Sequence, residues 1–425
     1  MRSAPPHDGR WSRLLGGIAD AFADANFRRY SVGAVVSWLS FFVQTVAVAW
    51  LTWGLTHSTK WLAIVALLDA VPMSVLAPVG GVVADRYDRF RVLLVCYGFA
   101  TVQSAALAGL AASGRLTIGW LAALALLHGV IHAFSVPAQF GLLPRFVERG
   151  RLPSAIAVAS AYAQFGLFVG PALAGWVILH GGPAVAFASN VFGYAVFFWS
   201  AALLRTPAGY RQPPASHKAF ARDFIDGVRA ILAHRGITGL LALMLFGDAL
   251  SGAVRQMLPA FADTGLHAGV AGLSTLLACA GIGATLSALW LAQGGAGRSR
   301  SSVIAWAFLG FLAATMLLTA TRTLLLAAPA MVAFGFGFAI CRTGTVALLQ
   351  TSVPDGLRGR LMSTQFFLQQ GASSLGVAAV GAAADSWGLR APLLCGTGLA
   401  FLVWIATFRA RERIAGAFAM RGDSS

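Results

Sequence analysis

The sequence predicts an all-α integral membrane protein with twelve transmembrane helices in two pseudo-symmetric six-helix bundles. Three observations lead to this prediction: apolar runs of membrane-spanning length, a one-sided distribution of basic residues, and an internal repeat. Hydrophobic residues make up 58% of the 425 residues and charged residues 11%. Ordinary globular domains carry roughly a quarter charged residues, so this composition excludes a soluble globular protein.

The predicted spans follow from length and hydropathy. A helix needs about 20 mostly apolar residues to cross the hydrocarbon core, and lipid offers an unpaired backbone no hydrogen-bond partner, so each span must be helical. Spans of the first half are expected at 30–53, 61–84, 92–112, 116–140, 153–179 and 183–204. Spans of the second half are expected at 237–261, 268–292, 302–321, 323–350, 361–384 and 391–408.

The polar segments between the spans set the expected organisation of the chain. The central linker is expected to contain an amphipathic helix on the membrane surface, because apolar residues recur in it at helical spacing beside charged ones. The expected parts are a cytoplasmic N-terminal segment over 1–29, a first bundle over 30–204, the cytoplasmic linker over 205–236, a second bundle over 237–408 and a cytoplasmic tail over 409–425.

Basic residues predict the orientation. Of the 31 Lys and Arg residues, 25 lie in segments that would share one side of the membrane, and only Lys60, Arg115, Arg322 and Arg390 would lie on the other. Because Lys and Arg near spans stay on the cytoplasmic face, both termini are expected in the cytoplasm of a bacterium, with the chain in its inner (plasma) membrane. The net charge of +16 is attributed to contact with the lipid bilayer, and no nucleic-acid partner is expected.

Two basic loops recur at one constant distance. Arg89–Arg91 returns as Arg298–Arg300, and Arg149–Leu152 returns as Arg358–Leu361, each time 209 residues later. A shared register six spans apart indicates duplication of a six-helix unit. Parallel repeats of this kind place a binding site between them near the middle of the membrane, which points to a transporter that opens alternately to either side.

The segment Gly81–Arg91 resembles the signature loop of the major facilitator superfamily, with Asp88 in place of its second glycine. Arg255–Phe261 and Leu357–Ser363 look like the branch of that superfamily that contains the enterobactin exporter and macrolide efflux pumps. The resemblance implies the major facilitator fold over 26–410 and secondary-active transport, without a cofactor.

The resemblance also implies a conformational-switch loop. Gly81 would let two helices approach closely. Asp85 would face the start of the eleventh span, where a carboxylate at a helix N-terminus is stabilised by about 0.3–1 kcal/mol. The second copy carries Gly294 at that position, so such a latch is one-sided. The alternative is that these charges only set the orientation. The loop residues are Gly81, Asp85, Arg86, Arg89, Arg91 and Arg145.

The fifth span carries Gly166, Gly170, Pro171 and Gly175, which resemble the antiporter motif of drug/proton exchangers. Physically, this pattern predicts a kinked helix with a smooth face for a neighbouring helix. Close packing without any relation to efflux is the alternative.

Charged residues inside the membrane are the candidates for proton coupling or substrate binding, because a charge at that depth is costly and usually functional. They are Asp69, Asp248 and Arg255. A carboxyl group in such surroundings can bind and release a proton near neutral pH. Alternatively, Asp248 neutralises Arg255, two turns away, or Arg255 receives an anionic substrate group. Arg342 is expected to extend towards the inner membrane surface.

Other polar residues in the spans are candidates for the lining of a central cavity. His128 and His132 share one helix face and could bind metal at this spacing, but no carboxylate or cysteine stands beside them in the sequence, so no metal site is expected. The cavity candidates are Gln44, His128, His132, Gln164, Asn190 and Gln350.

The sequence contains no phosphate-binding G-x-x-x-x-G-K-[ST] loop, so transport must draw on an ion gradient or on the substrate's own gradient. We expect proton-coupled efflux of small amphipathic molecules, drugs or siderophore-like metabolites, by a monomer. The alternative is an importer or facilitator of a small metabolite on the same fold. No catalytic constellation is present in the sequence, so an enzyme is not expected.

Overall fold

The computed structural model describes residues 22, 24–146, 152–203, 235–292, 300–352 and 355–409. This part of the chain consists of helices and short turns and contains no strand. Most of the expected N-terminal segment, nearly all of the linker with its amphipathic helix, and the tail beyond 409 lie outside the described residues.

Within the described residues, the first half contains five helices. They are α2 (Ala25–Thr56), α3 (Thr59–Arg86), α4 (Arg89–Ala112), α5 (Ile118–Phe146) and α6 (Leu152–Ala202). The last of them covers both the fifth and the sixth predicted span. It breaks at Gly182, whose φ of 73° and ψ of 177° are non-helical. Glycine adopts a positive φ without a steric penalty, and the following Pro183 suits the first turn of a new helix, so the two spans reverse direction at this point.

The second half contains α8 (Arg235–Ala260), the short π-helix η2 (Phe261–Gly265), α9 (Gly269–Ala292), α10 (Arg300–Ala320), α11 (Leu324–Ser352), α12 (Asp355–Trp387) and α13 (Arg390–Arg409). Among the described residues, ten helices are long and apolar enough to cross a membrane. The more polar α12, with three glutamines and two serines between 365 and 374, is not one of the ten.

Side-chain caps fix where several helices begin. Asp24 accepts hydrogen bonds from the backbone N–H groups of Asn26 (2.7 Å) and Phe27 (3.1 Å) at the start of α2. Asp88 caps α4 in the same way through the N–H of Phe90, at 3.3 Å. These N–H groups have no partner within their own helix, and a carboxylate cap satisfies them. The caps explain why α2 starts five residues before its predicted span.

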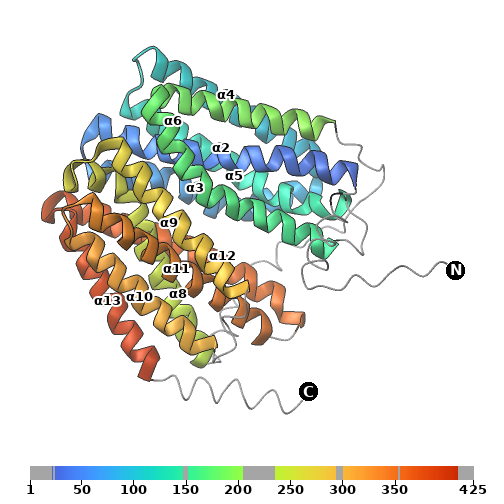
Figure 1. Cartoon of the computed structure of the whole chain (residues 1–425). Coiled ribbons are helices and arrows are strands. Elements are labelled where there is room, and N and C mark those ends of the chain that lie inside the picture. Colours follow the sequence, from blue (N-terminus) through green and yellow to red (C-terminus); the bar gives the residue numbers. More distant parts are fainter. Residues whose placement is uncertain are drawn as a thin grey trace, which may run out of the picture.

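The two halves pack their helices in corresponding ways (Figure 1). In the first half, a Cβ atom at Gly129 of α5 would overlap the backbone carbonyl of Asp69 in α3. In the second half, a Cβ atom at Gly335 of α11 would overlap the carbonyl of Ala280 in α9. Small residues that let membrane helices approach closely thus recur at equivalent helix pairs, as expected for two copies of one unit.

One expectation about close packing is wrong. A Cβ atom at Gly81 would meet nothing within 4 Å, whereas at Gly80 it would overlap the carbonyl of Ala133 in α5. The tight contact therefore falls one residue earlier, because a shift of one residue turns a side chain by about 100° around the helix axis.

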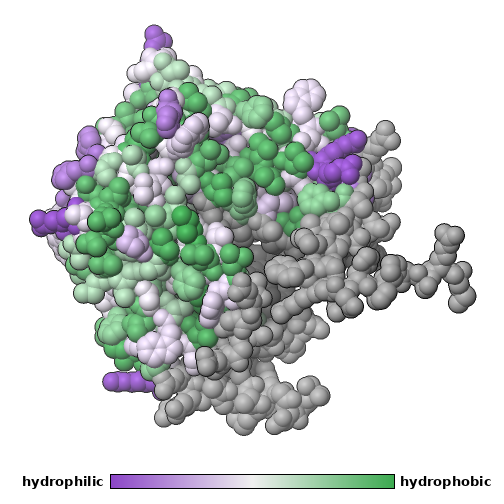
Figure 2. Space-filling model, viewed as in Figure 1, coloured by the Kyte–Doolittle hydropathy of each residue, from purple (hydrophilic) through white to green (hydrophobic). Residues whose placement is uncertain are grey.

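Much of the outer surface of the helices is apolar (Figure 2). Large side chains such as Trp199 (66%), Leu325 (84%) and Leu375 (72%) are strongly exposed on different helices. Exposed apolar surface of this extent is what a lipid bilayer covers. The protein is therefore an all-α, multi-pass membrane protein.

The two ends of the molecule differ. We call the end with the α2–α3 and α12–α13 turns the closed end, and the end where α2 begins and α13 finishes the termini end (Figure 1). The largest buried apolar cluster belongs to the second half but includes Trp53 and Leu62 of the first, both near the closed end.

Candidate functional site

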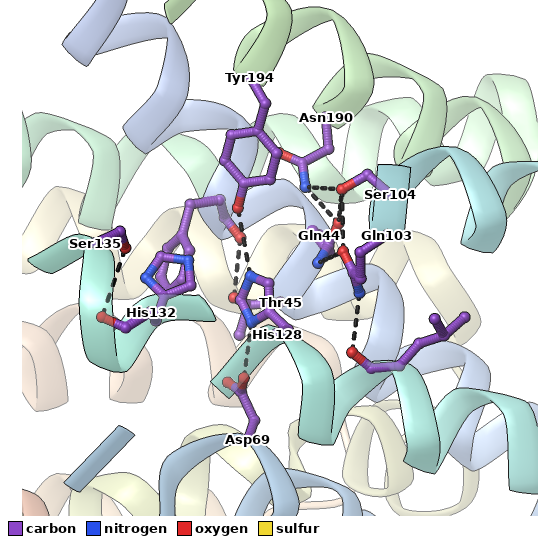
Figure 3. A network of polar contacts seen from close by, with 12 residues as sticks. Gln44, Thr45, Asp69, Gln103, Ser104, His128, His132, Ser135, Asn190 and Tyr194 are labelled. Carbon is purple, nitrogen blue, oxygen red and sulfur yellow. Dashed lines mark hydrogen bonds and ion pairs between the residues drawn. The ribbon is translucent and has the colours of Figure 1, made fainter. Parts of the chain in front are cut away.

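A polar chain of three residues crosses the first half (Figure 3). Nδ1 of His128 in α5 lies 2.7 Å from a carboxylate oxygen of Asp69 in α3. Its Nε2 lies 3.3 Å from the hydroxyl of Tyr194 in α6. The Asp69 side chain is 36% exposed and that of His128 5%, so the chain leads from a partly accessible carboxyl group to a buried hydroxyl.

The helices bring Asp69 and His128 to one depth. Each residue lies ten positions from the start of its helix at the closed end, or about 15 Å along the axis. Gly129, next to His128, touches the backbone carbonyl of Asp69. The close approach of α3 and α5 therefore sets the contact between the carboxyl group and the imidazole.

The pair can hold protons in more than one arrangement. With Asp69 ionised and His128 neutral, Nδ1–H donates to the carboxylate and Nε2 accepts from the Tyr194 hydroxyl. With His128 doubly protonated, Nε2–H donates to the Tyr194 oxygen instead. The same contacts thus accommodate a change of one proton.

His132 does not join this chain through hydrogen bonds of its ring. Its ring centroid lies 4.4 Å from that of His128 and 4.9 Å from that of Phe41. The two histidines therefore share a face, as their spacing predicts, but His128 directs both nitrogens to Asp69 and Tyr194. Among the described residues, no three His, Cys, Asp or Glu side chains are grouped as metal ligands.

A second buried network lies beside the first (Figure 3). Ser104 donates to the Gln44 carbonyl oxygen at 2.8 Å, and the Asn190 amide donates to the same oxygen and to Ser104, the latter at 3.0 Å. The Gln44 amide donates to the Gln103 side-chain oxygen at 3.4 Å, and the Gln103 amide donates to the carbonyl of Leu124 at 3.1 Å. These bonds tie α2, α4, α5 and α6 together. Gln44 and Asn190 are thus buried in a structural network.

The polar interior of the second half is built differently. The buried Asp248 of α8 accepts a hydrogen bond of 3.0 Å from the Gln369 amide of α12. The same amide lies 3.4 Å from the sulfur of Met244. Asp248 is 13 residues from the start of α8, about 20 Å along the helix axis, and so lies near the middle of the bundle.

Two arginines share this region with Asp248. Arg342 of α11 and Arg255 of α8 both interact electrostatically with the Asp248 carboxylate and with each other. Neither forms a direct ion pair with Asp248 in the described structure. Arg342 lies ten residues from the end of α11, about 15 Å along the axis. At this depth Arg342 interacts with the opposite charge of Asp248, and the extension of its side chain towards the inner membrane surface stays a prediction.

Arg255 is held by its own helix and by an aromatic ring. Its Nε–H donates to the carbonyl of Ser251 at 3.3 Å, and its guanidinium carbon lies 5.7 Å from the ring centre of Phe338 in α11. The expected neutralisation of Arg255 by Asp248 is therefore indirect and is shared with Arg342.

A carboxylate joins the two halves at the closed end. Asp385, near the end of α12, accepts hydrogen bonds from the hydroxyls of Thr59 (2.6 Å) and Ser58 (2.9 Å). It also accepts from the backbone N–H groups of Thr59 (2.9 Å) and Lys60 (3.3 Å), the first two residues of α3. We call this contact the Asp385 latch. The repeat that aligns Asp85 with Gly294 does not reveal it.

Other hydrogen bonds between the halves lie in the same half of the membrane. The Trp53 indole donates to Asp263 of η2 at 2.9 Å, and the Gln256 amide donates to the carbonyl of Leu62 at 3.0 Å. Within the described residues, the bond furthest from the closed end is that of the Ser274 hydroxyl to the carbonyl of Ala172, at 3.4 Å. Among the residues that the structure describes, the halves are thus joined by hydrogen bonds towards one end.

The glycine motif of the fifth span lies at two helix contacts. A Cβ atom at Gly166 would lie 2.9 Å from the Cβ of Trp38, and one at Gly170 2.5 Å from the Cβ of Phe42, both in α2. A Cβ atom at Gly175 would overlap Ser274 of α9, in the other half. Pro171 is half-buried between these contacts.

The switch loop is described only in part. Arg86 and Arg91 are exposed, and Arg89 donates through Nε to the carbonyl of Ala84 at 3.2 Å. The side chains of Asp85, Arg145, Gln164 and Gln350 lie outside the described part of the structure.

Sequence reasoning missed two residues of these sites, Tyr194 and Asp385. Tyr194 resembles any aromatic residue in an apolar helix, and no signal in a single sequence marks it as the partner of His128. Asp385 stands one residue beyond its predicted span; the Ser-Thr pair that it binds is a typical helix-start signal and could have indicated a partner.

Comparison with known proteins identifies the family of this chain. Residues 18–422 match the family described as transmembrane secretion effector. The chain is 27% identical over 338 residues to the enterobactin exporter EntS of Escherichia coli O1:K1 / APEC, which covers 79% of each protein. The EntS protein of Escherichia coli (strain SE11) shows the same identity and coverage.

Solved structures share the fold. A bacterial homologue of the human lysosomal transporter Spinster superposes with a TM-score of 0.70 at 13% identity, over 92% of this chain and 98% of that one. The nucleoside transporter NupG superposes with a TM-score of 0.68 at 13% identity, over 91% and 98%. The protein is a multi-pass membrane transporter of the major facilitator superfamily, not an enzyme, and belongs to its transmembrane secretion effector family.

Proposed function

We propose that this transporter exports small amphipathic molecules from the cytoplasm in exchange for protons, by alternating access. The observation that carries the proposal is the Asp69–His128–Tyr194 chain, which holds a partly accessible carboxyl group against a buried imidazole. An intramembrane carboxyl–histidine pair is the type of group that proton-driven transporters use.

The alternating-access part rests on the contacts between the halves. The basic loops assign the termini end to the cytoplasm. The hydrogen bonds between the halves lie towards the opposite end, at the Asp385 latch and at Trp53–Asp263. This arrangement corresponds to an inward-facing state. Opening to the outside requires these bonds to break while the halves close at the termini end.

The residues that couple transport to protons are, in this proposal, Asp69 and His128, and not Asp248. The carboxyl group of Asp69 has a histidine partner that can share a proton with it. Asp248 instead accepts from an amide, which has no proton to exchange, and faces two permanently charged arginines. A proton bound by the first pair removes negative charge from the first half and leaves the second half unchanged.

The export direction is supported by relatives. EntS is named an enterobactin exporter, and the family is described as a secretion effector. The chain is 27% identical to EntS, so direction is a subject for experiment.

The experiment uses membrane vesicles containing the full chain and two fluorescent xanthene dyes, anionic fluorescein and cationic rhodamine 123. Inside-out vesicles with an acidic interior should accumulate a dye, and a protonophore should abolish the accumulation. Asp69→Asn should lose the gradient-driven accumulation but keep exchange of labelled for unlabelled dye. Asp248→Asn, a substitution of the same kind, should keep its response to the gradient.

Three results would decide against parts of the proposal. Gradient-driven accumulation that survives in Asp69→Asn excludes the proton role of that residue. Accumulation in energised right-side-out vesicles instead of inside-out ones assigns the chain to uptake. Movement that ignores every ion gradient assigns it to facilitated diffusion.

A further inference from the structure

The charges in the middle of the second half do not balance. Asp248 carries one negative charge, whereas Arg255 and Arg342 carry one positive charge each, and all three interact electrostatically. Arginine stays protonated in proteins. A surplus of one positive charge at membrane depth is costly unless a counter-ion or water reaches it.

The hydrogen-bonding capacity of the two arginines is also unused. In the part of the chain that the structure describes, the only bond donated by either guanidinium group is that of Arg255 Nε–H to the carbonyl of Ser251. The Asp248 carboxylate, which could accept from them, bonds to Gln369 instead. Both arginines are partly exposed, so a ligand can reach them.

The surroundings add an apolar component. The guanidinium group of Arg255 lies over the Phe338 ring at 5.7 Å. A guanidinium plane stacked on one aromatic ring can stack a second on its free face. Met244 and Cys341 are buried in the same region of α8 and α11. These neighbours suit an aromatic or aliphatic body next to an acidic group.

The described residues of the first half form no comparable site for an anion. The carboxylate near the middle of this half, Asp69, is paired with His128. The amides and the hydroxyl of Gln44, Gln103, Ser104 and Asn190 bond to one another or to backbone. A negatively charged ligand in this region would be repelled by the Asp69 carboxylate and would meet donors that already form hydrogen bonds.

We propose that Arg255 and Arg342 form the binding site for the acidic group of a small amphipathic organic anion. When no anion is bound, the Asp248 carboxylate serves as the counter-ion of the two arginines. This inference rests on the proposed transport function and names its substrate class. It predicts opposite effects at neighbouring residues. Loss of an arginine weakens anion binding, whereas loss of the Asp248 charge removes a competitor and strengthens it.

The test measures binding separately from transport. Fluorescence anisotropy of fluorescein and of rhodamine 123, which share a xanthene ring but differ in charge, is recorded with the full chain purified in detergent. Fluorescein should bind more tightly than rhodamine 123. Arg342→Gln and Arg255→Gln should each weaken fluorescein binding by about 10-fold or more, as expected for the loss of a charged hydrogen-bonding partner.

Matched variants separate charge from folding. Arg342→Lys keeps the charge but loses the planar fork of donors, so it should weaken fluorescein binding less than Arg342→Gln does. Asp248→Asn should tighten fluorescein binding by about 3-fold or more. If an Arg→Gln variant does not fold, as judged by size-exclusion chromatography, the Asp248→Asn result carries the test.

The outcomes are distinguishable from failure of the transport function. Arginine-dependent binding of fluorescein without movement of dye in vesicles supports the site and contradicts the proposed export. The anion site is overturned, and export is left standing, if either dye is transported but fluorescein binding fails one of three criteria. Fluorescein binding would then be absent, weaker than that of rhodamine 123, or unaffected by both Arg→Gln changes. Weaker fluorescein binding in Asp248→Asn also overturns it.

Discussion

The two halves use buried polar residues in different ways. In the first half, Gln44 and its partners bond to one another across four helices, and Asp69 has a histidine partner. In the second half, one amide holds Asp248, and two arginines share its charge without a direct bond. In the described residues, the buried side chains of the first copy therefore bond mainly to one another, whereas the second copy leaves two guanidinium groups with hydrogen-bonding capacity for a ligand. The two proposals above place proton binding in the first half and substrate binding in the second.

The largest effect is expected where packing holds the first half together. Gly129→Ala would place a Cβ atom on the backbone carbonyl of Asp69, so α3 and α5 must separate. Overpacking of this kind costs about 3 kcal/mol, and it should also disrupt the Asp69–His128 contact. The free energy of unfolding in mixed detergent–SDS micelles measures the change.

A glycine without neighbours is the control. A Cβ atom at Gly109 of α4 would meet nothing within 4 Å, and Gly→Ala in such a helix position is neutral or slightly stabilising. Equal stabilities of Gly129→Ala and Gly109→Ala would show that the close approach of α3 and α5 is not required.

A smaller effect is expected from the hydrogen-bond networks themselves. Gln44→Leu leaves partners in a buried network without one of their bonds and should cost about 1–2 kcal/mol. Gln365→Leu is the matched change in the second half, because Gln365 is similarly buried but contacts only the Met244 sulfur, at 3.7 Å. It should cost less than about 0.5 kcal/mol. The same unfolding assay compares them, and equal losses would remove the contrast between the halves.

The smallest effect concerns the Asp385 latch, which joins the halves. Asp385→Asn keeps an acceptor oxygen but loses the charge that favours the start of α3, a difference of about 0.5–1 kcal/mol at an exposed site. The ratio of latched to unlatched molecules should fall by about 2–5-fold. Distances between spin labels at Leu55 and Trp387, in a cysteine-free background, report that ratio; an unchanged distribution would show that the latch does not hold the closed end.

The latch also has a defined response to pH. Partial burial raises the pKa of Asp385, but hydrogen bonds from the Thr59 and Ser58 side chains and from backbone N–H groups outweigh it, so the pKa lies below 3.8. A lowered pKa means that the contribution is complete above the ordinary value and is lost as pH falls through the lowered one. The difference between the unchanged protein and Asp385→Asn should therefore stay constant between about pH 5 and pH 8.

The sequence was sufficient for features that lipid imposes on every span. Helix positions follow from apolar length, and Asp69, Asp248 and Arg255 attract attention because charge is rare at that depth. The start of α2 was less accurate, since this helix begins at a cap five residues before its predicted span. The break at Gly182 falls between the fifth and sixth predicted spans.

Partnerships between residues far apart in sequence could not be predicted. Asp69 and His128 were each singled out, but their contact depends on how Gly129 brings α3 to α5. The interaction of Arg342 with Asp248 was not predicted, because the two residues belong to different helices. Three-dimensional packing, and not local pattern, decides these positions.

The turn between α2 and α3 contains only His57 and Ser58. So short a connection leaves neither helix freedom to tilt alone, and α2 also carries Gln44, which binds α4 and α6 through its network. A displacement of Ser58 therefore moves the whole first half as a rigid body. When the hydrogen bonds to the Asp385 carboxylate break, the first half should rotate as one rigid body. The closed end should then open in a single all-or-none step and not one helix at a time.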